Sequence, residues 1–97
     1  MQIEKKLDGE KLTLKVIGRL DTNTSPDLEA ALKLDGVKEV LFDFSNLEYI
    51  SSAGLRILLT VQKSMMSCGG AMTVSSPNES VKSVFEITGC SDIFTII

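Results

Sequence analysis

Residues 48–59, EYISSAGLRILL, lie at the middle of the 97-residue chain and join two different patterns. The first half ends in two adjacent serines, and the second half is apolar with helical spacing. Serine is a favoured N-cap residue, because its hydroxyl accepts a hydrogen bond from an unpaired N–H group of the first turn. We therefore predict a helix over about residues 52–67, which ends at the glycine pair 69–70.

The predicted helix has more apolar residues than one face can hold. At roughly 100° per residue, one row of small and apolar residues must face the core: Gly54, Ile57, Leu58, Val61, Met65 and Cys68. A polar row lies opposite: Arg56, Thr60, Lys63 and Ser67. Leu55, Leu59 and Met66 fall on the flank between them. We expect these three side chains to be partly exposed, and either a neighbouring element or a binding partner covers them.

The segments before this helix read as strands. The dipeptide Asp8-Gly9 is a strong hairpin signal, and apolar residues alternate with polar ones after it. We predict antiparallel strands near 2–7 and 11–18. The segment 37–44, VKEVLFDF, is apolar on both faces, which indicates a buried strand near the centre of a sheet.

Helices alternate with the remaining strands. One helix begins at Ser25 as the N-cap with Pro26 at its first position, and ends at Gly36. A short strand over 71–75 precedes a third helix that is capped by Asn78, and 93–97 can add an edge strand. The order β-β-α-β-α-β-α-(β) predicts one α/β domain over residues 1–97. Its mixed, mostly parallel sheet has 4–5 strands and packs against 3–4 helices.

The composition excludes several classes of protein. The chain has no histidine, which removes the usual nucleophile pairs and the commonest metal ligand. No phosphate-binding glycine loop is present, so we expect neither an enzyme nor a cofactor. A net charge of −3 argues against nucleic acid as a partner.

The sequence shows neither a signal peptide nor an apolar run long enough to span a bilayer, so we expect a cytoplasmic protein without membrane insertion. Cys68 and Cys90 are expected to be free thiols in the core.

Working sites in open α/β sheets gather at the carboxyl ends of parallel strands. Two loops are expected there: residues 20–24 after the second strand and 45–52 after the third. Asp21 and Ser52 should therefore lie near each other. Ser52 has two interpretations. It is either only a helix cap or, because a helix N-terminus favours anions, a site for a phosphate group.

Three segments resemble the STAS domain of bacterial anti-sigma factor antagonists. The central one is DFSNLEYISSAGLRILL at 43–59, which is similar to the strand, loop and helix start of the family's signature. The segments GRLDTNTSPDLEAAL at 18–32 and GGAMTVSSPNESVKSVFEITG at 69–89 resemble its first strand-to-helix unit and its last strand and helix. The resemblance covers nearly the whole chain in order.

The resemblance implies roles for individual residues. The family's phosphorylated serine falls on Ser52, its partner-contacting aspartate on Asp21, and its strand-end aspartate on Asp43. Ser51 stands where many phosphorylatable members have aspartate, so Ser51 remains an alternative site of modification. The predicted partner-binding surface consists of the following residues: Asp21, Thr22, Ser51, Ser52, Ala53, Gly54, Leu55, Arg56 and Leu59.

The function implied by the resemblance is that of an anti-sigma factor antagonist. Such a protein binds an anti-sigma factor that is also a serine kinase, and thereby releases the sigma factor. Phosphorylation of Ser52 would dissociate the complex, and a phosphatase would reset it. The alternative keeps the fold and makes the chain a non-phosphorylated STAS adaptor subunit of a lipid-transport ATPase complex. We expect a monomer in either case.

Overall fold

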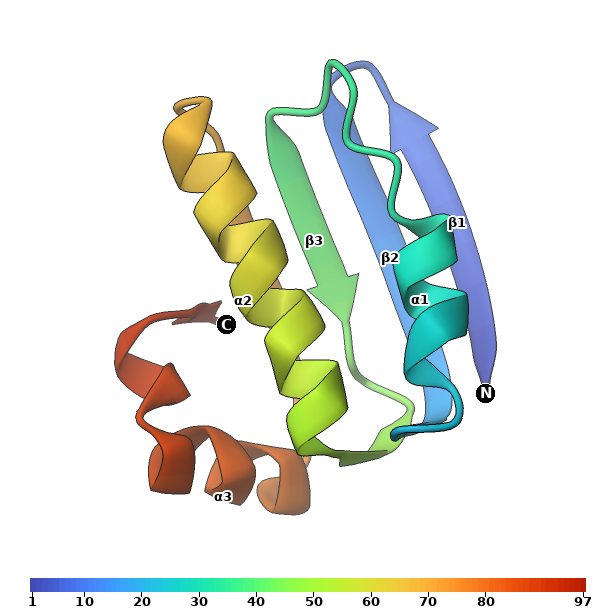
Figure 1. The fold of residues 1–97 in the computed structure, drawn as a ribbon, viewed down its shortest axis with the longest axis vertical. Coiled ribbons are helices and arrows are strands. Elements are labelled where there is room, and N and C mark those ends of the chain that lie inside the picture. The colour runs from blue at the N-terminus through green and yellow to red at the C-terminus, as the bar shows by residue number, and fades with distance from the viewer.

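The computed structural model describes all 97 residues, in an order that interleaves strands and helices (Figure 1). The elements are β1 (Gln2–Asp8), β2 (Lys11–Leu20), α1 (Ser25–Ala31), β3 (Glu39–Asp43), β4 (Leu47–Ile50), α2 (Ser52–Ser67), β5 (Ala71–Ser75), α3 (Glu79–Thr88), the 3-10 turn η1 (Cys90–Asp92) and β6 (Thr95–Ile96). The predicted order of elements is thereby confirmed, with one additional strand, β4.

The sheet has six strands and is mixed. Five of them lie side by side in the order β1-β2-β3-β5-β6. Only the hairpin partners β1 and β2 are antiparallel, and β2–β3, β3–β5 and β5–β6 are parallel. The parallel pairs follow from the helical connections, because a helix that crosses the sheet returns the chain in the same direction.

β4 was not predicted, and it changes the geometry of the site. β3 pairs with β2 only up to Lys15, and β4 pairs in parallel with the following residues Gly18 to Leu20. The register shifts between Gly18 and Arg19. Residues 45–52, which the sequence predicts as a loop, therefore contain a strand that continues the sheet beyond the end of β3. The sequence did not predict β4 because a strand of four residues, with both end residues buried, shows no regular alternation of apolar and polar residues.

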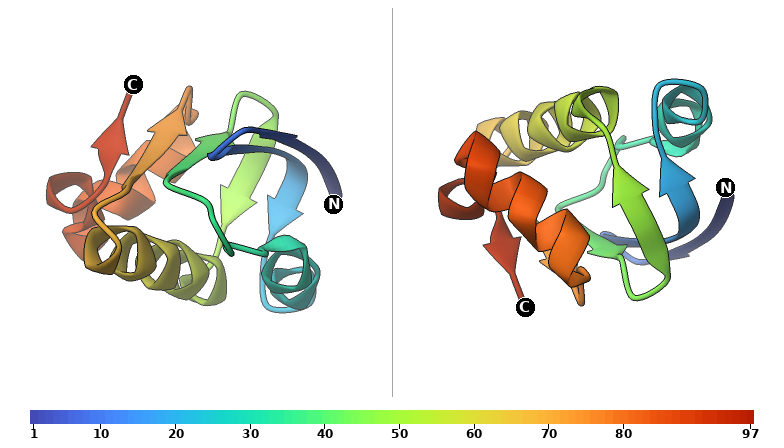
Figure 2. Two further views of the ribbon diagram at one scale, coloured as in Figure 1. Left: turned by 90° about the horizontal axis from the view of Figure 1, so that it is seen from above. Right: turned by 90° about the horizontal axis from the view of Figure 1, so that it is seen from below.

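Helices α1 and α2 cover one face of the sheet. Both views in Figure 2 show α1 and α2 on the same side of the strands. The core between these layers includes Val40 and Phe42 of β3 and the following Phe44. It also includes four residues of the predicted row of α2: Ile57, Leu58, Val61 and Met65. The other face of β3 is less buried than we expected: Leu41 is only half-buried and Glu39 is exposed. Helices α1 and α2 both lie on the opposite side of the sheet, and of the two residues predicted for this face only Val37, just before β3, is buried.

Both ends of α1 differ from the predicted ends by a few residues. Thr24 is the N-cap residue of α1 and Ser25 is its first helical residue, where its buried hydroxyl bonds to the Asp21 carbonyl. The helix ends at Ala31 and the chain is extended at Leu32, well before Gly36. Both differences arise because several neighbouring residues could serve as cap or terminator. Of the two cysteines, Cys90 is buried as expected, but Cys68 is exposed at the C-terminal end of α2.

One asparagine joins two elements near the site. The Asn78 side-chain oxygen accepts a bond from the Val81 N–H at 2.8 Å, and it caps α3 as predicted. Its Nδ2 group donates to the Leu47 carbonyl at 3.0 Å and to the Glu48 carbonyl at 3.4 Å. Because Leu47 and Glu48 belong to β4, a single amide fastens the start of α3 to that strand.

Candidate functional site

The two serines at the start of α2 differ in backbone conformation and in hydrogen bonding. Ser51 has an extended backbone (φ −96°, ψ 174°), and its hydroxyl accepts a hydrogen bond from the Gly54 N–H at 3.3 Å. Ser51 is therefore the cap. Ser52 is the first helical residue, it is exposed, and its hydroxyl has no partner within the protein. The first turn of this 16-residue helix contains no acidic residue, so the positive end of its dipole is not offset by charge.

Gly54 lets the helix start approach the sheet closely. A Cβ atom at this position would lie 2.8 Å from Leu20 Cγ and 2.9 Å from Ile50 Cγ1. Leu20 and Ile50 are the last residues of β2 and β4, so the glycine sets the distance between the helix and both strand ends. Gly54 is buried, and its contribution to the site is this packing rather than the exposed contact that we predicted.

Asp21 organises the loop after β2. Its carboxylate accepts bonds from the N–H groups of Asn23 at 3.0 Å and Thr24 at 3.1 Å. The Thr24 N–H is the main cause that lowers the pKa of Asp21 below its ordinary value, and the nearby Arg19 guanidinium adds to it. The loop is thus held by an ionised carboxylate that is still half-exposed.

The structure brings Asp21 and Ser52 to the same end of the sheet, as predicted. β2 and β4 run parallel, Leu20 pairs with Ile50, and the Ser51 N–H donates to the Leu20 carbonyl at 2.9 Å. A shallow hollow of about 180 Å³ lies between the two helices that follow these strands. Its walls combine predicted residues with residues of α1: Thr22, Ser25, Pro26, Glu29, Ala53, Arg56 and Ile57.

Sequence reasoning missed a stacked pair next to the Asp21 loop. The Arg19 guanidinium lies 4.4 Å from the centre of the Tyr49 ring, and its Nε atom lies 3.8 Å from the Asp21 carboxylate. Arg19 and Tyr49 are direct partners in the β2–β4 pairing. Because β4 was not predicted, nothing in the sequence indicated that the two residues are neighbours. Together they form a cationic and aromatic flank next to the acidic loop.

Leu55 was predicted to be partly exposed and to contact a partner, and this prediction is wrong. Only 5% of Leu55 is exposed, and it belongs to the same core cluster as Phe85 and Phe94 from the C-terminal segment. The helix layout assumed that only one face of α2 is covered, whereas Leu55 on the flank of the helix belongs to the core as well. Leu59 and Met66, at 38% and 70% exposure, do lie open as predicted.

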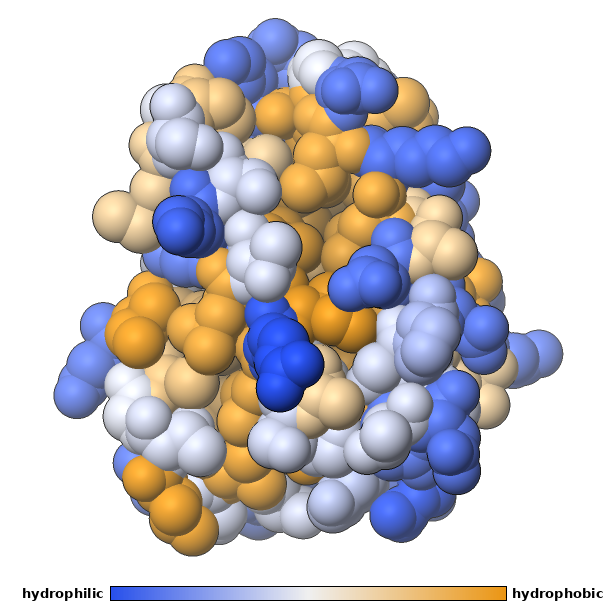
Figure 3. All heavy atoms as spheres, in the orientation of Figure 1, coloured by the Kyte–Doolittle hydropathy of each residue, from blue (hydrophilic) through white to orange (hydrophobic).

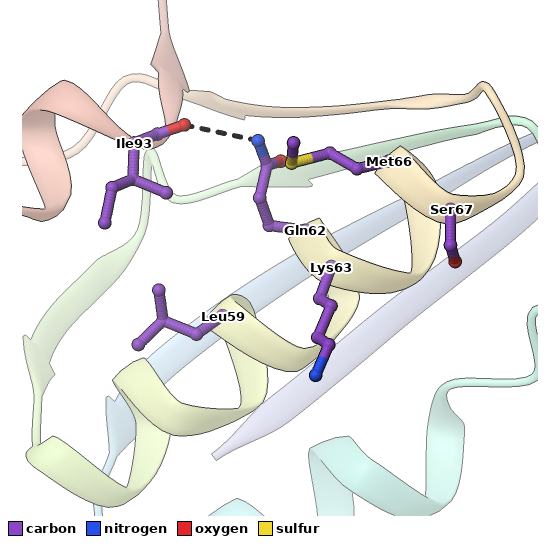
Figure 4. Close-up of a pocket in the computed structure, with 6 residues that line it drawn as sticks. All are labelled: Leu59, Gln62, Lys63, Met66, Ser67 and Ile93. Atoms are coloured by element: carbon purple, nitrogen blue, oxygen red, sulfur yellow. Dashed lines mark hydrogen bonds between the residues drawn. The ribbon is translucent and has the colours of Figure 1, made fainter.

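Leu59 lies on a different surface from Ser52. Figure 4 shows it with Met66 and Ile93 around an apolar hollow of about 590 Å³ on the outer flank of α2. The Gln62 side chain closes one side of the hollow and donates to the Ile93 carbonyl at 3.2 Å. In Figure 3, apolar surface is visible on this flank of the molecule. The structure therefore separates Leu59 from the hollow beside Asp21.

Asp43, the third aspartate of interest, is not part of this site either. It pairs with Lys15, five residues before the end of β2, and its carboxylate accepts a bond from the Ser45 N–H at 3.0 Å. The Ser45 side chain and then this N–H hold the pKa of Asp43 below its ordinary value. Asp43 thus stabilises the turn between β3 and β4.

The site is therefore a small surface at the carboxyl ends of two parallel strands, with an ionised loop and a free serine hydroxyl at a helix start. The chain matches the STAS domain family over residues 2–97 and belongs to that family. No helix of the chain combines the length and the hydropathy that crossing a bilayer would need.

Proteins of related sequence and fold are named for one activity. The chain is 35% identical over 94 residues to the candidate anti-sigma factor antagonist BtrV of Bordetella bronchiseptica, which covers 94% of this chain and 80% of that protein. It is 26% identical over 99 residues to the anti-sigma-B factor antagonist of Staphylococcus aureus, with 99% and 92% covered. The unphosphorylated form of the anti-sigma factor antagonist SpoIIAA, from Bacillus, has the same fold, with a TM-score of 0.86 at 17% identity over 99% of this chain and 88% of that one. SpoIIAA has also been solved in a phosphorylated form, with a TM-score of 0.72, 16% identity, and 99% and 91% covered.

Proposed function

We propose that this protein is an anti-sigma factor antagonist that is switched by phosphorylation of Ser52. The observation that carries the proposal is the difference between the two serines. The Ser51 hydroxyl is engaged as the helix cap, whereas the Ser52 hydroxyl is exposed and has no partner. The names of the relatives support the antagonist role. The resemblance of segment 43–59 to the family's signature, which places the phosphorylated serine at Ser52, supports the switch.

The proposed docking surface is the end of the sheet around the hollow between α1 and α2. It contains the half-exposed Asp21, the exposed Thr22 and Arg56, and the half-exposed Ala53. Ser51 and Ser52 form its edge. The acidic loop is already ordered by its own hydrogen bonds, so a partner that binds it has little loop entropy to remove. An anti-sigma factor with kinase activity would bind here, and in doing so would release its sigma factor.

Phosphorylation would act on the complex more than on the fold. Transfer of the γ-phosphoryl group of ATP to the Ser52 oxygen releases ADP and adds about −1.5 to −2 charges at this position. In the free protein the dipole at the start of α2 favours that charge, and Arg56 is four residues further along the same helix face. In the complex the same charge must be desolvated beside Asp21, which weakens binding. A phosphatase that hydrolyses the ester would restore docking. This role would place the protein in the cytoplasm.

Affinity capture tests the proposal. The tagged protein is incubated with lysate of its own cells, with and without ATP, and bound proteins and its own intact mass are read by mass spectrometry. We expect a kinase-type anti-sigma factor without ATP, and with ATP a mass increase of one phosphate, located on Ser52, together with loss of the complex. Phosphate on Ser51 alone contradicts the site. A stable complex with a transporter ATPase that ATP does not dissociate supports the adaptor role instead.

Ser52→Asp and Ser67→Asp add the same charge at two positions, so their comparison separates an effect of position 52 from an effect of net charge. Ser52→Asp should weaken capture of the anti-sigma factor, and Ser52→Ala should keep the complex intact when ATP is added. Ser67→Asp is the matched control, because Ser67 is exposed at the opposite end of α2, about 22 Å along the helix. Equal loss of binding in Ser52→Asp and Ser67→Asp would show that net charge, rather than position 52, governs the complex.

A further inference from the structure

The free edge of β1 is a second candidate interaction surface. β1 is the terminal strand of the sheet: it pairs with β2 on one side and has no strand on the other (Figure 1). Every β1 residue except Ile3 is exposed, including Leu7 at 60%. An edge strand of seven residues presents N–H and C=O groups that another strand can pair with.

The hairpin turn determines which backbone groups point outward. β1 and β2 are joined by the two-residue turn Gly9-Glu10, with φ of +61° at Gly9, and Asp8 pairs with Lys11. The residues that flank a two-residue hairpin turn form a hydrogen-bonded pair, and the pattern then alternates along the strand. Even-numbered residues of β1 therefore bond to β2. The N–H and C=O groups of Ile3, Lys5 and Leu7 point away from the sheet.

We propose that β1 pairs with β1 of a second copy of this chain, antiparallel, about a two-fold axis at Lys5. Outward-pointing residues must lie opposite one another, so only registers that place odd-numbered residues together are allowed. The axis at Lys5 pairs Ile3 with the Leu7 of the second copy, and Glu4 with its Lys6. Each of these pairs occurs twice by symmetry, which gives two apolar and two oppositely charged pairs.

The neighbouring registers are electrostatically worse. An axis at Glu4 places two Glu4 carboxylates opposite each other and sets Ile3 against Lys5. An axis at Lys6 opposes two Lys6 ammonium groups and sets Glu4 against Asp8. The axis at Lys5 also places two Lys5 side chains opposite each other. Their repulsion is reduced because each Lys5 Nζ donates to the Ala31 carbonyl of α1 in its own chain at 3.2 Å. Among the three central registers, charge and apolar pairing favour the one with its axis at Lys5.

The pairing also suits the two sides of the strand. Ile3 is partly buried against the helix-side core, and Leu7 lies in the same row, so the two apolar pairs would form on the side of α1. Glu4 and Lys6 lie in the alternate row on the open side of the sheet. Five residues paired per strand bury less than the roughly 1,000 Å² expected of a stable interface, so the dimer forms reversibly and depends on concentration.

Cysteine scanning tests the register. Three variants, Glu4→Cys, Lys5→Cys and Lys6→Cys, are made in a Cys68→Ser background, because Cys68 is the exposed native thiol. Only Lys5→Cys places a thiol opposite its own copy. In the other two, the identical residues are offset by two positions, about 7 Å along the strand, which together with the strand spacing exceeds the disulfide limit of about 7 Å between Cα atoms. We expect Lys5→Cys alone to form a disulfide-linked dimer under mild oxidation. Equal crosslinking of Glu4→Cys or Lys6→Cys, or none of Lys5→Cys, overturns the proposal.

A charge swap tests the ion pairs in the chain with its native cysteines. Glu4→Lys should weaken dimerisation roughly fourfold or more in sedimentation velocity, since two attractive cross-strand pairs become repulsive. The double variant Glu4→Lys/Lys6→Glu restores both pairs with reversed signs and should recover the dimer. Both residues are exposed, and because Glu4 also lies opposite Lys15 of β2, thermal melts verify that each variant is folded at the temperature of the measurement. A protein that stays monomeric at millimolar concentration, or a double variant no better than the single one, refutes the pairing.

Discussion

Replacement of Gly54 by alanine should disturb the position of the helix start without unfolding the protein. The new Cβ would lie 2.8 Å from Leu20 Cγ, 2.9 Å from Ile50 Cγ1 and 3.0 Å from Leu20 Cδ2. Carbon atoms in contact prefer separations of about 3.5–4.0 Å, so each contact is short by roughly 0.5–1 Å. Leu20 and Ile50 are 0% and 1% exposed, and neither side chain can turn into solvent. The first turn of α2 must therefore move away from the strand ends.

Two opposing terms determine the size of the effect. Alanine is favoured over glycine within a helix by about 1 kcal/mol. Overpacking of a filled core costs about 1–3 kcal/mol. The net result is a loss of about 1 kcal/mol in the free energy of unfolding, which lowers the Tm of a domain of this size by about 4–8 °C. Binding at the docking surface should fall more than stability does, because the shift is concentrated at Ser52.

Urea denaturation of a double-mutant cycle with Leu20→Ala measures the clash directly. Leu20→Ala removes two of the three atoms that meet the new methyl group, so Gly54→Ala should cost less in that background than in the wild type. The reasoning is refuted if Gly54→Ala raises the Tm of the wild-type protein, or if its cost is the same in both backgrounds. Either result would mean that the helix start has room to spare.

Three further predictions concern the stability of the fold. Leu58→Ala should cost about 2–5 kcal/mol in urea denaturation because Leu58 is fully buried, whereas Leu59→Ala, at 38% exposure, should cost clearly less. Thermal melts should show a loss of about 1 kcal/mol for Ser51→Ala, which removes the cap, and almost none for Ser52→Ala. The lowered pKa of Asp21 means that its ionised form stabilises the fold above the unfolded-state pKa near 4, and that this stabilisation is lost as pH falls through the lower, folded-state pKa. Asp21→Asn should therefore flatten the acid limb of a Tm-against-pH curve, and an unchanged slope would contradict the role given to the carboxylate.

The sequence carried enough information for most elements because strong local signals coincided with the tertiary structure. The Asp8-Gly9 signal predicted the hairpin, although the two turn residues are Gly9 and Glu10, and the apolar row of α2 pointed to the core, as the burial of Leu58 confirms. β4 was missed because its four residues are defined by pairing with the end of β2, which is a non-local property. The prediction for Leu55 failed because a helix layout alone does not show how much of the helix the rest of the chain covers, and Leu55 is buried in the core.

The double use of the Asn78 amide has a consequence for local motion. β4 holds its place through a short pairing with β2 and through the bonds from Asn78 Nδ2 to its carbonyl groups. Any event that frays the first turn of α3 therefore loosens β4 as well, and with it the serine that follows. The backbone amides of Gly18 and Ser51, which donate to Asn46 and Leu20 on either side of β4, should then exchange with solvent deuterium at a common rate, faster than the amides of β3. The end of the sheet would open as one cooperative unit. The access of a modifying enzyme to Ser52 would then depend on the stability of α3, a helix that does not touch the docking surface.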